Sequence, residues 1–312
     1  MLSRRTLLAT AAALAAGSAM PASAQALHRY QAGGVPEESI LPALWAQQSG
    51  IFRHNGFELG IDAQRSGSAV AAAVAGGAYA IGKSSLIALI SAHAHDIPFV
   101  IVWPGGLYET SRPNNGLMVK ADSPLRTGAD LNGKTIAVSS LGDLYTVSIK
   151  AWIDGHGGDS TTIKLVELPT DAVAGAIATG RIDAGAMGTP QFQQAVESGL
   201  RILGRPYDAV APLFYFSAWF TTRKFLDENR PVVEGFARAM KAAATYVNGH
   251  PQQTIDLLAK FTGIEPDVIA RMPRARMATS LDPRLLQAAI DLSAKYKVIP
   301  ASFNARDFCA TL

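Results

Sequence analysis

The fold class is decided by residues 127–192, TGADLNGKTIAVSSLGDLYTVSIKAWIDGHGGDSTTIKLVELPTDAVAGAIATGRIDAGAMGTPQF, where short apolar runs alternate with helical patterns. Strands are predicted at 135–139, 162–168 and 182–187, because these short apolar runs are bounded by polar residues and glycines. A helix is predicted from residue 144, with apolar side chains recurring along one face. Strands and helices that alternate in this way predict a parallel sheet covered by helices.

Two polar loops follow predicted strands in this stretch and open the next helices. They are Ser139–Asp143 and Gly188–Pro190, both short, hydroxyl-bearing and glycine-containing. Ligands of such sheets lie beyond the carboxyl ends of the strands, and helix N-termini offer free N–H groups to anionic or polar ligands. The loops are therefore candidate ligand contacts, although ordinary strand-to-helix turns have the same composition.

Several short motifs of this stretch together resemble a known family. They are ADLNGK at 129–134, Ser139-Ser140-x-Gly142, GRIDA at 180–184 and Thr189-Pro190. In this order and spacing they resemble the second lobe of periplasmic solute-binding proteins that serve ABC importers. The resemblance is to the nitrate, alkanesulfonate and taurine branch, which includes binders of thiamine-pyrimidine precursors, and it runs from about Leu27 to the C-terminus.

The resemblance implies an α/β protein with the type II periplasmic binding protein fold, in which two α/β lobes are joined by a two-segment hinge. Irregular stretches near 104–116 and 205–215 mark two crossings between lobes. Lobe 1 is therefore predicted to be discontinuous, with residues 27–112 and 213–312, and lobe 2 to span 113–212. Closure of the lobes around a ligand is the motion expected of such a hinge.

The N-terminus predicts export. Arg4 and Arg5 precede an apolar run at 7–16, and small residues at the right spacing allow cleavage near Ala24 or Ala26. Residues 1–26 are therefore interpreted as a signal peptide, since the apolar run is too short to span a bilayer. The twin arginines favour the Tat route, although Sec signals can also contain Arg-Arg. No cysteine lies at the cleavage site, so we expect an unanchored periplasmic protein and no lipoprotein.

Composition and charge exclude several classes of function. The chain has 312 residues, 48% of them hydrophobic, and a formal net charge of +3 without a basic run, which argues against nucleic-acid binding. Cys309 is the single cysteine, so no disulfide can form within the chain. We expect no cofactor.

Two sequence matches are rejected on their context. Residues 77–84, GAYAIGKS, match the Walker A pattern, but the preceding segment is predicted as a helix where a phosphate loop needs a strand. Here a strand at 78–81 is predicted to end at Gly82, with Ser84 and Ser85 opening a helix. His93 and His95 lie two apart and would not share a helix face, so no metal site is predicted.

Five loops are expected to converge on the cleft between the lobes, together with aromatic residues near the hinge. The predicted ligand-binding residues are Val35, Pro36, Glu37, Ser84, Ser85, Tyr108, Ser139, Gly142, Asp143, Leu144, Tyr145, Gly188, Thr189 and Tyr215. The hydroxyls and helix N-termini suit an oxyanion, to which Lys83 or Arg65 could add charge. Glu37, Glu38 and Asp143 favour an amino-bearing ligand instead, and the sequence leaves this choice open.

These observations favour a non-catalytic protein that captures a small solute (a sulfonate, nitrate, taurine-like or related molecule) between its lobes. The resemblance implies an ABC permease with its cytoplasmic ATPase as the partner, and we expect a monomer. One alternative is an enzyme on the same fold, of the thiamine-pyrimidine synthesis or desulfinase type. These types need cysteines that this chain lacks or carries only at Cys309. Another alternative is a ligand-sensing partner of a membrane receptor.

Overall fold

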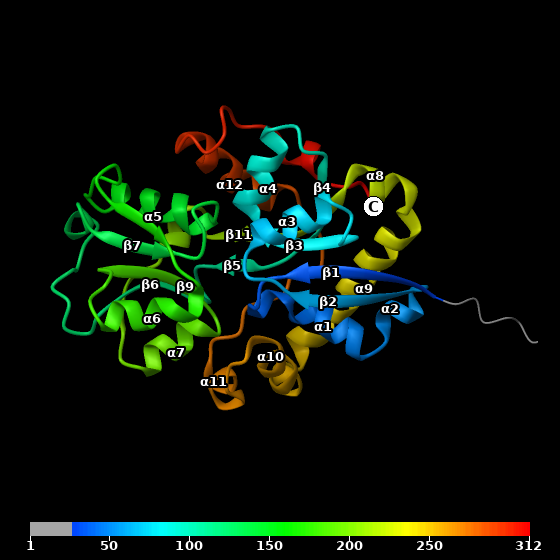
Figure 1. Ribbon diagram of the computed structural model, residues 1–312, viewed down its shortest axis with the longest axis horizontal. Helices are drawn as coiled ribbons and strands as arrows, with labels where there is room; N and C mark the ends of the chain where they lie inside the picture. The colour runs from blue at the N-terminus through cyan, green and yellow to red at the C-terminus, as the bar shows by residue number, and fades with distance from the viewer. Residues whose placement is uncertain (1–26) are drawn as a thin grey trace, which may run out of the picture.

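The computed structural model describes residues 27–312, so the predicted signal peptide lies outside the described residues. Two five-stranded sheets lie side by side in the molecule (Figure 1). The first has the order β2 (Phe57–Ala63), β1 (His28–Gly34), β3 (Ile81–Ser85), β12 (Ser217–Thr222) and β4 (Phe99–Pro104). The second has the order β10 (Arg201–Gly204), β6 (Asn115–Val119), β9 (Ala184–Gly188), β7 (Thr135–Val138) and β8 (Lys164–Glu167).

Each sheet combines parallel and antiparallel pairs. β1 is parallel to β2 and β3, and β7 is parallel to β8 and β9, as the alternation of strands and helices predicts. β12 is antiparallel to β3 and β4, and β6 is antiparallel to β9 and β10. β12 and β6 enter their sheets from the crossing segments and not from a covering helix, which explains their reversed direction.

Helices cover both faces of each sheet (Figure 1). Those of the first sheet are α1 (Leu41–Gln48), α2 (Ile51–His54), α3 (Gly67–Ala75), α4 (Leu86–Ala94), α8 (Arg223–Glu228) and α9 (Arg230–Gly249). Those of the second are α5 (Leu144–Gly155), α6 (Thr170–Ala178) and α7 (Gln191–Glu197). The C-terminal part adds α10 (Ile255–Thr262), α11 (Pro266–Arg271) and α12 (Arg284–Lys295).

Five short 3-10 helices join these elements. They are η1 (Glu38–Ile40), η2 (Ala129–Leu131), η3 (Pro206–Ala209), η4 (Pro251–Thr254) and η5 (Ala305–Phe308). No helix among residues 27–312 is both long and apolar enough to cross a membrane.

The cores follow from the apolar pattern. All six residues of β4 are buried, because helices cover that strand on both faces. On α9 the buried side chains recur every three or four residues, and they include Val233, Phe236, Met240 and Val247. Packing of these buried faces holds the helices against the sheets, and this positions the loops at the ends of the strands.

Two segments connect the sheets, and they pair with each other. β5 (Leu107–Glu109) and β11 (Leu213–Tyr215) form an antiparallel two-stranded ribbon. The strands of the first sheet come from residues 28–104 and 217–222, and those of the second from residues 115–204. The proposed lobe boundaries agree with this distribution and remain a prediction.

Two sequence predictions of strands are wrong. The aromatic run at 213–222 predicts one long strand, but the chain is divided at Phe216, where it leaves β5 and joins the first sheet between β3 and β4. The strand expected to end at Gly82 begins at Ile81 instead and continues to Ser85. Polar residues inside this strand concealed it, and Lys83 and Ser84 are nevertheless 1% and 2% exposed.

Candidate ligand-binding cavity

A cavity of about 140 Å³ lies between the two sheets, at the carboxyl ends of β1, β3, β7 and β9. All the predicted ligand-binding residues line it except Tyr108, Leu144 and Tyr215. The chain thus brings together loops from residues 35 to 189 at one place. Their role in binding remains a prediction.

The three exceptions are buried in the core beside the cavity. Leu144 is fully buried in the first turn of α5. Tyr108 is fully buried as part of β5, and its hydroxyl donates to Asp208 Oδ1 at 2.6 Å. The Tyr215 hydroxyl donates to the Ser280 carbonyl at 2.8 Å. Contrary to the expectation that they face the cavity, neither ring lines it, since both pack in the core and their hydroxyls are held by Asp208 and Ser280. Their role as ligand contacts stays a prediction.

A different set of aromatic side chains forms the cavity wall. The rings of Tyr145 and Tyr207 stack with centroids 4.8 Å apart, and Tyr207 lies 5.8 Å from Phe216. Burial raises the pKa of both tyrosines well above the ordinary value, so both phenols stay neutral. Tyr207 and Phe216 were missed, since η3 had no sequence pattern and Phe216 was assigned to a strand interior.

Lys83 places a buried cation beside the cavity. Its side chain is 1% exposed and forms an ion pair with Glu37 Oε1. Glu37 also accepts a hydrogen bond from Ser39 Oγ at 3.0 Å. β3 holds Lys83 in register with Trp219 of β12, which is also fully buried. A buried charge needs such a partner, so Lys83 and Glu37 neutralise each other.

Asp143 joins elements from the two sheets. It is the N-cap residue of α5 and accepts from the Tyr145 N–H at 3.4 Å. It also accepts from Ser139 Oγ, and from Ser85 Oγ of β3 at 3.3 Å. Burial raises the pKa of the Asp143 carboxyl, and the negative charge of Glu37 raises it further.

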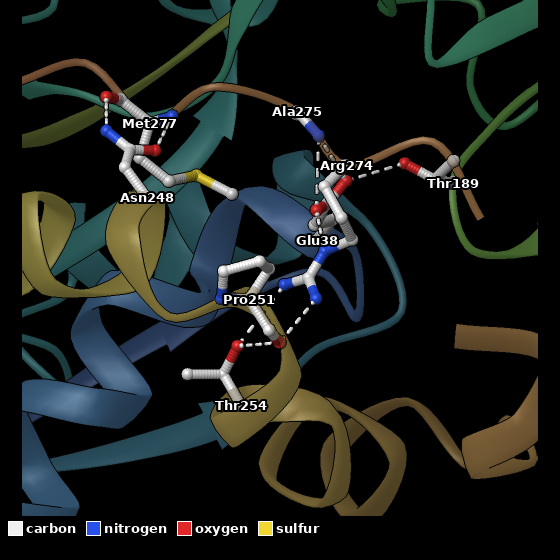
Figure 2. A network of polar contacts seen from close by, with 8 residues as sticks. All are labelled: Glu38, Thr189, Asn248, Pro251, Thr254, Arg274, Ala275 and Met277. Atoms are coloured by element: carbon white, nitrogen blue, oxygen red, sulfur yellow. Dashed lines mark hydrogen bonds and ion pairs between the residues drawn. The ribbon is translucent and has the colours of Figure 1, made fainter. Parts of the chain in front are cut away.

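Glu38 forms a second connection, shown in Figure 2. It is 2% exposed and accepts from Arg274 Nε at 2.6 Å, from the Ala275 N–H and from Thr189 Oγ1 at 3.0 Å. Burial raises the pKa of the Glu38 carboxyl, and Arg274 opposes this. Arg274 is anchored in turn by the Pro251 carbonyl at 2.9 Å. The C-terminal segment thus contacts a side chain that lines the cavity, and no pattern in the sequence predicts this contact.

Two polar atoms at the cavity have no partner among the residues that the structure describes. They are Ser84 Oγ and Asn115 Oδ1, on side chains 2% and 1% exposed. Asn115 Nδ2 donates to Asn114 Oδ1 at 3.1 Å, which leaves its oxygen free to accept. A buried polar group without a hydrogen bond costs about 1–3 kcal/mol. A bound polar ligand would satisfy both atoms.

Metal-ligating side chains and the single cysteine bear on whether the cavity could serve an enzyme. Within residues 27–312, no cluster of three or more His, Cys, Asp or Glu side chains could hold a metal ion. Cys309 lies outside the cavity lining, beside Ile101 of β4. Burial raises the pKa of the Cys309 thiol to about 12, which opposes formation of a nucleophilic thiolate.

The sequence of the chain matches a known protein family. The family profile described as NMT1/THI5 like matches residues 37–254. The chain belongs to the NMT1/THI5-like family. A curated relative, the "Putative aliphatic sulfonates-binding protein" of Escherichia coli (strain K12), is 28% identical over 199 residues. This match covers 61% of the chain and 60% of the relative's length.

Solved structures of sulfonate-binding proteins share the fold of this chain. The periplasmic aliphatic sulphonate binding protein SsuA from Escherichia coli has a TM-score of 0.74 at 21% identity, covering 91% of this chain and 92% of that one. The alkanesulfonate-binding protein SsuA from Xanthomonas axonopodis pv. citri, bound to MOPS, has a TM-score of 0.75 at 20% identity, covering 90% and 98%. The chain therefore has the periplasmic binding protein fold, as the sequence predicted.

The same fold also occurs in an enzyme. The desulfurization enzyme DSZB has a TM-score of 0.70 at 15% identity, covering 91% of this chain and 96% of that one. The fold is therefore compatible with both a binding protein and an enzyme, and the distinction between these functions depends on the residues of the cavity.

Proposed function

We propose that this protein captures a small solute with a sulfonate or similar oxyanion group in the cavity between its sheets. We further propose that it delivers the solute to an ABC permease with a cytoplasmic ATPase. The observation that carries the proposal is the cavity between the two sheets, where the lining residues Ser84 and Asn115 each have a polar atom without a partner within residues 27–312. The likeness to sulfonate-binding proteins supports the choice of ligand class.

The first turn of α3 suits the oxyanion. Ser66, Gly67 and Ser68 line the cavity at this N-terminus, where backbone N–H groups and the helix dipole favour negative charge. An added Cβ at Gly67 would lie 2.3 Å from Ser84 Oγ, so a larger residue there would force the Ser84 side chain to move. The free hydroxyl of Ser84 is therefore held against the same helix end.

An enzyme on this fold is a weaker proposal. A desulfinase-type reaction needs a reactive thiolate at the ligand, whereas Cys309 lies outside the cavity lining and has a raised pKa. A sensor for a membrane receptor would use the same cavity and differ in its docking partner. Periplasmic location, signal-peptide cleavage and the monomeric state belong to the proposal as well.

Thermal unfolding with a panel of alkanesulfonates, nitrate and carboxylates tests the binding function. A ligand at about one hundred times its dissociation constant adds about 2.7 kcal/mol to the free energy of unfolding. For a chain of this size we expect a rise in Tm of roughly 5–10 °C for one chemical class. Chemical conversion of the bound solute, followed by mass spectrometry, would contradict a non-catalytic role.

A further inference from the structure

Glu38 lines the cavity with a carboxylate that is held by donors from both sides. Arg274 Nε donates to it at 2.6 Å, and the Ala275 N–H also donates to it. Both donors belong to the proposed lobe 1, as Glu38 does. The third donor, Thr189 Oγ1 at 3.0 Å, belongs to the proposed lobe 2 (Figure 2). Contacts within one lobe therefore fix the carboxylate in the position where the other lobe meets it.

The side chain of Arg274 is itself fixed. It is 15% exposed, and its two terminal nitrogens donate to the Pro251 carbonyl at 2.9 Å and to Thr254 Oγ1 at 3.4 Å. Figure 2 shows the guanidinium group between these acceptors and Glu38. A planar guanidinium with several anchored donors sets the direction of the carboxylate as well as its charge. Arg274 does not line the cavity, so it can act on a ligand there only through another residue.

The segment that carries Arg274 connects α11 to α12 and contains no helix or strand, from residue 272 to residue 283. Side-chain contacts hold it in place instead. Asn248 of α9 exchanges two hydrogen bonds with the backbone of Met277, at 2.8 and 2.9 Å (Figure 2). Arg276 forms an ion pair with Glu109 of β5. The segment is therefore attached both to α9 and to the ribbon that connects the two sheets.

We infer that Arg274 is a positioning residue for ligand binding, because it holds the Glu38 carboxylate where Thr189 meets it when the two lobes close. The inference rests on the proposed binding function and adds to it a residue outside the cavity that determines affinity. Burial raises the pKa of Glu38, and the charge and hydrogen bond of Arg274 lower it. Without Arg274 the carboxyl is more readily neutral, and a neutral carboxyl is a weaker acceptor for Thr189.

Calorimetric titration with propanesulfonate measures the effect in two variants. Arg274→Met removes the charge and all donors, and we expect roughly tenfold weaker binding, the value of one hydrogen bond to a charged group. Arg274→Lys restores a cationic donor to Glu38, and we expect binding within about threefold of the native protein.

A double-mutant cycle with Thr189→Val separates positioning from a general structural role. If Arg274 acts through Glu38 on Thr189, its loss has little left to weaken once the Thr189 hydroxyl is absent. The double variant should then bind about tenfold more weakly than the native protein, as each single variant does. A general structural role would act independently of Thr189, and the two losses would combine to about a hundredfold.

A second cycle covers the cost of leaving a buried carboxylate without its cation, which can prevent Arg274→Met from folding. In Glu38→Gln no buried carboxylate remains, so the further change Arg274→Met leaves no unpaired charge. This further change should alter affinity by less than about threefold, since no carboxylate is left to position. Circular dichroism of each variant checks the fold.

Arg29→Met is the matched control. It removes an arginine from an ion pair with Glu58 at the exposed start of β1, away from the cavity lining, and should keep the native affinity.

The outcomes distinguish this inference from the proposed function. Native affinity in Arg274→Met, or losses that combine in the cycle with Thr189→Val, would overturn the inference and leave sulfonate binding intact. A tenfold loss on adding Arg274→Met to Glu38→Gln would also overturn it, because Arg274 would then act by a route other than Glu38. If the native protein does not bind propanesulfonate at millimolar concentration, the proposed function fails and the inference fails with it.

Discussion

At the residue scale, Lys83 belongs to a pattern typical of phosphate binding but has a different role in the structure, as the partner of a carboxylate. The lysine completes a Walker A pattern at 77–84, but it lies inside β3 and forms an ion pair with Glu37. A phosphate loop would instead present this lysine at the start of a helix that follows a strand. The ion pair neutralises the buried charge of Lys83. Of the carboxylates that line the cavity, Asp143 is then the one held by hydrogen bonds without an ion pair among the described residues.

Asp143 also gives a prediction about pH. Burial raises its pKa in the ligand-free protein, so a proton occupies the carboxyl at pH values where an exposed aspartate is already ionised. Folding therefore takes up a proton in the pH range between the ordinary pKa and the raised one. We expect the free energy of unfolding to fall as the pH rises through this range, by up to about 1.4 kcal/mol per unit.

Urea denaturation from pH 4 to 8 measures this dependence. Glu37, Tyr145 and Tyr207 also lie near Asp143, and the raised pKa values of the two tyrosines keep both phenols neutral throughout this range. Asp143→Asn separates the contribution of Asp143 from that of Glu37 and should show a flatter profile. A variant profile as steep as that of the native protein would assign the proton to another group.

At the scale of elements, β3 is the strand on which the cavity depends. α3 packs against it through Val70 and Val74, and Phe220 of β12 approaches the same point. A Cβ added to Gly82 would lie 2.6 Å from Val70 and 2.7 Å from Val74. The glycine is therefore required by close packing of a helix on a strand, and phosphate binding does not explain it.

Substitution of this glycine should destabilise the protein. We expect Gly82→Ala to lower the free energy of unfolding by about 1–3 kcal/mol, because the methyl group overpacks the contact between α3 and β3. Urea denaturation followed by circular dichroism measures the change.

Gly175→Ala is the matched control for Gly82→Ala. Gly175 lies inside α6, and an added Cβ there meets nothing within 4 Å. Since alanine has the higher helix propensity, this variant should be about 0.5–1 kcal/mol more stable than the native protein. Equal destabilisation of both variants would show that packing against β3 is not the cause.

The elements also show which parts of the fold the sequence could predict. Local patterns predicted β7, β8, β9 and the helices between them, because burial of apolar faces produces regular spacing. The bounds of β3 were predicted wrongly, because Lys83, Ser84 and Ser85 in this strand are polar and line the cavity. Local spacing holds no information about such a polar strand.

The residues of the candidate site likewise fall into those that local sequence patterns predicted and those that they did not. Loops at strand ends, such as Ser139 and Thr189, were predicted because topology places them at the cavity. Tyr207, Asn115 and Arg274 were missed, since they reach the site through η3, the first residue of β6 and the C-terminal segment. Their positions are set by tertiary contacts between residues far apart in the sequence.

At the scale of the whole molecule, few polar contacts join the two sheets across the cavity. Ser85 donates to Asp143 at 3.3 Å, and Thr189 donates to Glu38 at 3.0 Å. Both pairs connect residues of the proposed lobe 1 with residues of the proposed lobe 2. If the lobes open about the ribbon of β5 and β11, these contacts break together, and they form again on closure around a ligand.

The Thr189 contact provides a test of closure. Thr189→Val keeps the side-chain volume but removes the donor to the buried Glu38 carboxylate, which costs roughly 1–3 kcal/mol in the closed form. If this contact exists only in the closed form, the cost reduces ligand affinity by roughly tenfold or more. Small-angle X-ray scattering should also show a smaller ligand-induced decrease in the radius of gyration than for the native protein.

Thr262→Val is the control for this experiment. The Thr262 hydroxyl donates to the Leu258 carbonyl within α10, so its loss does not involve both lobes. We expect its affinity and its scattering change to match those of the native protein. Native affinity in Thr189→Val, together with the native change in radius, would mean that this contact does not stabilise closure. Closure would then depend on the ligand and on the other contacts between the proposed lobes, which include Ser85 with Asp143, the Arg271–Glu197 ion pair and the hydrogen bond from Tyr296 to Asp154.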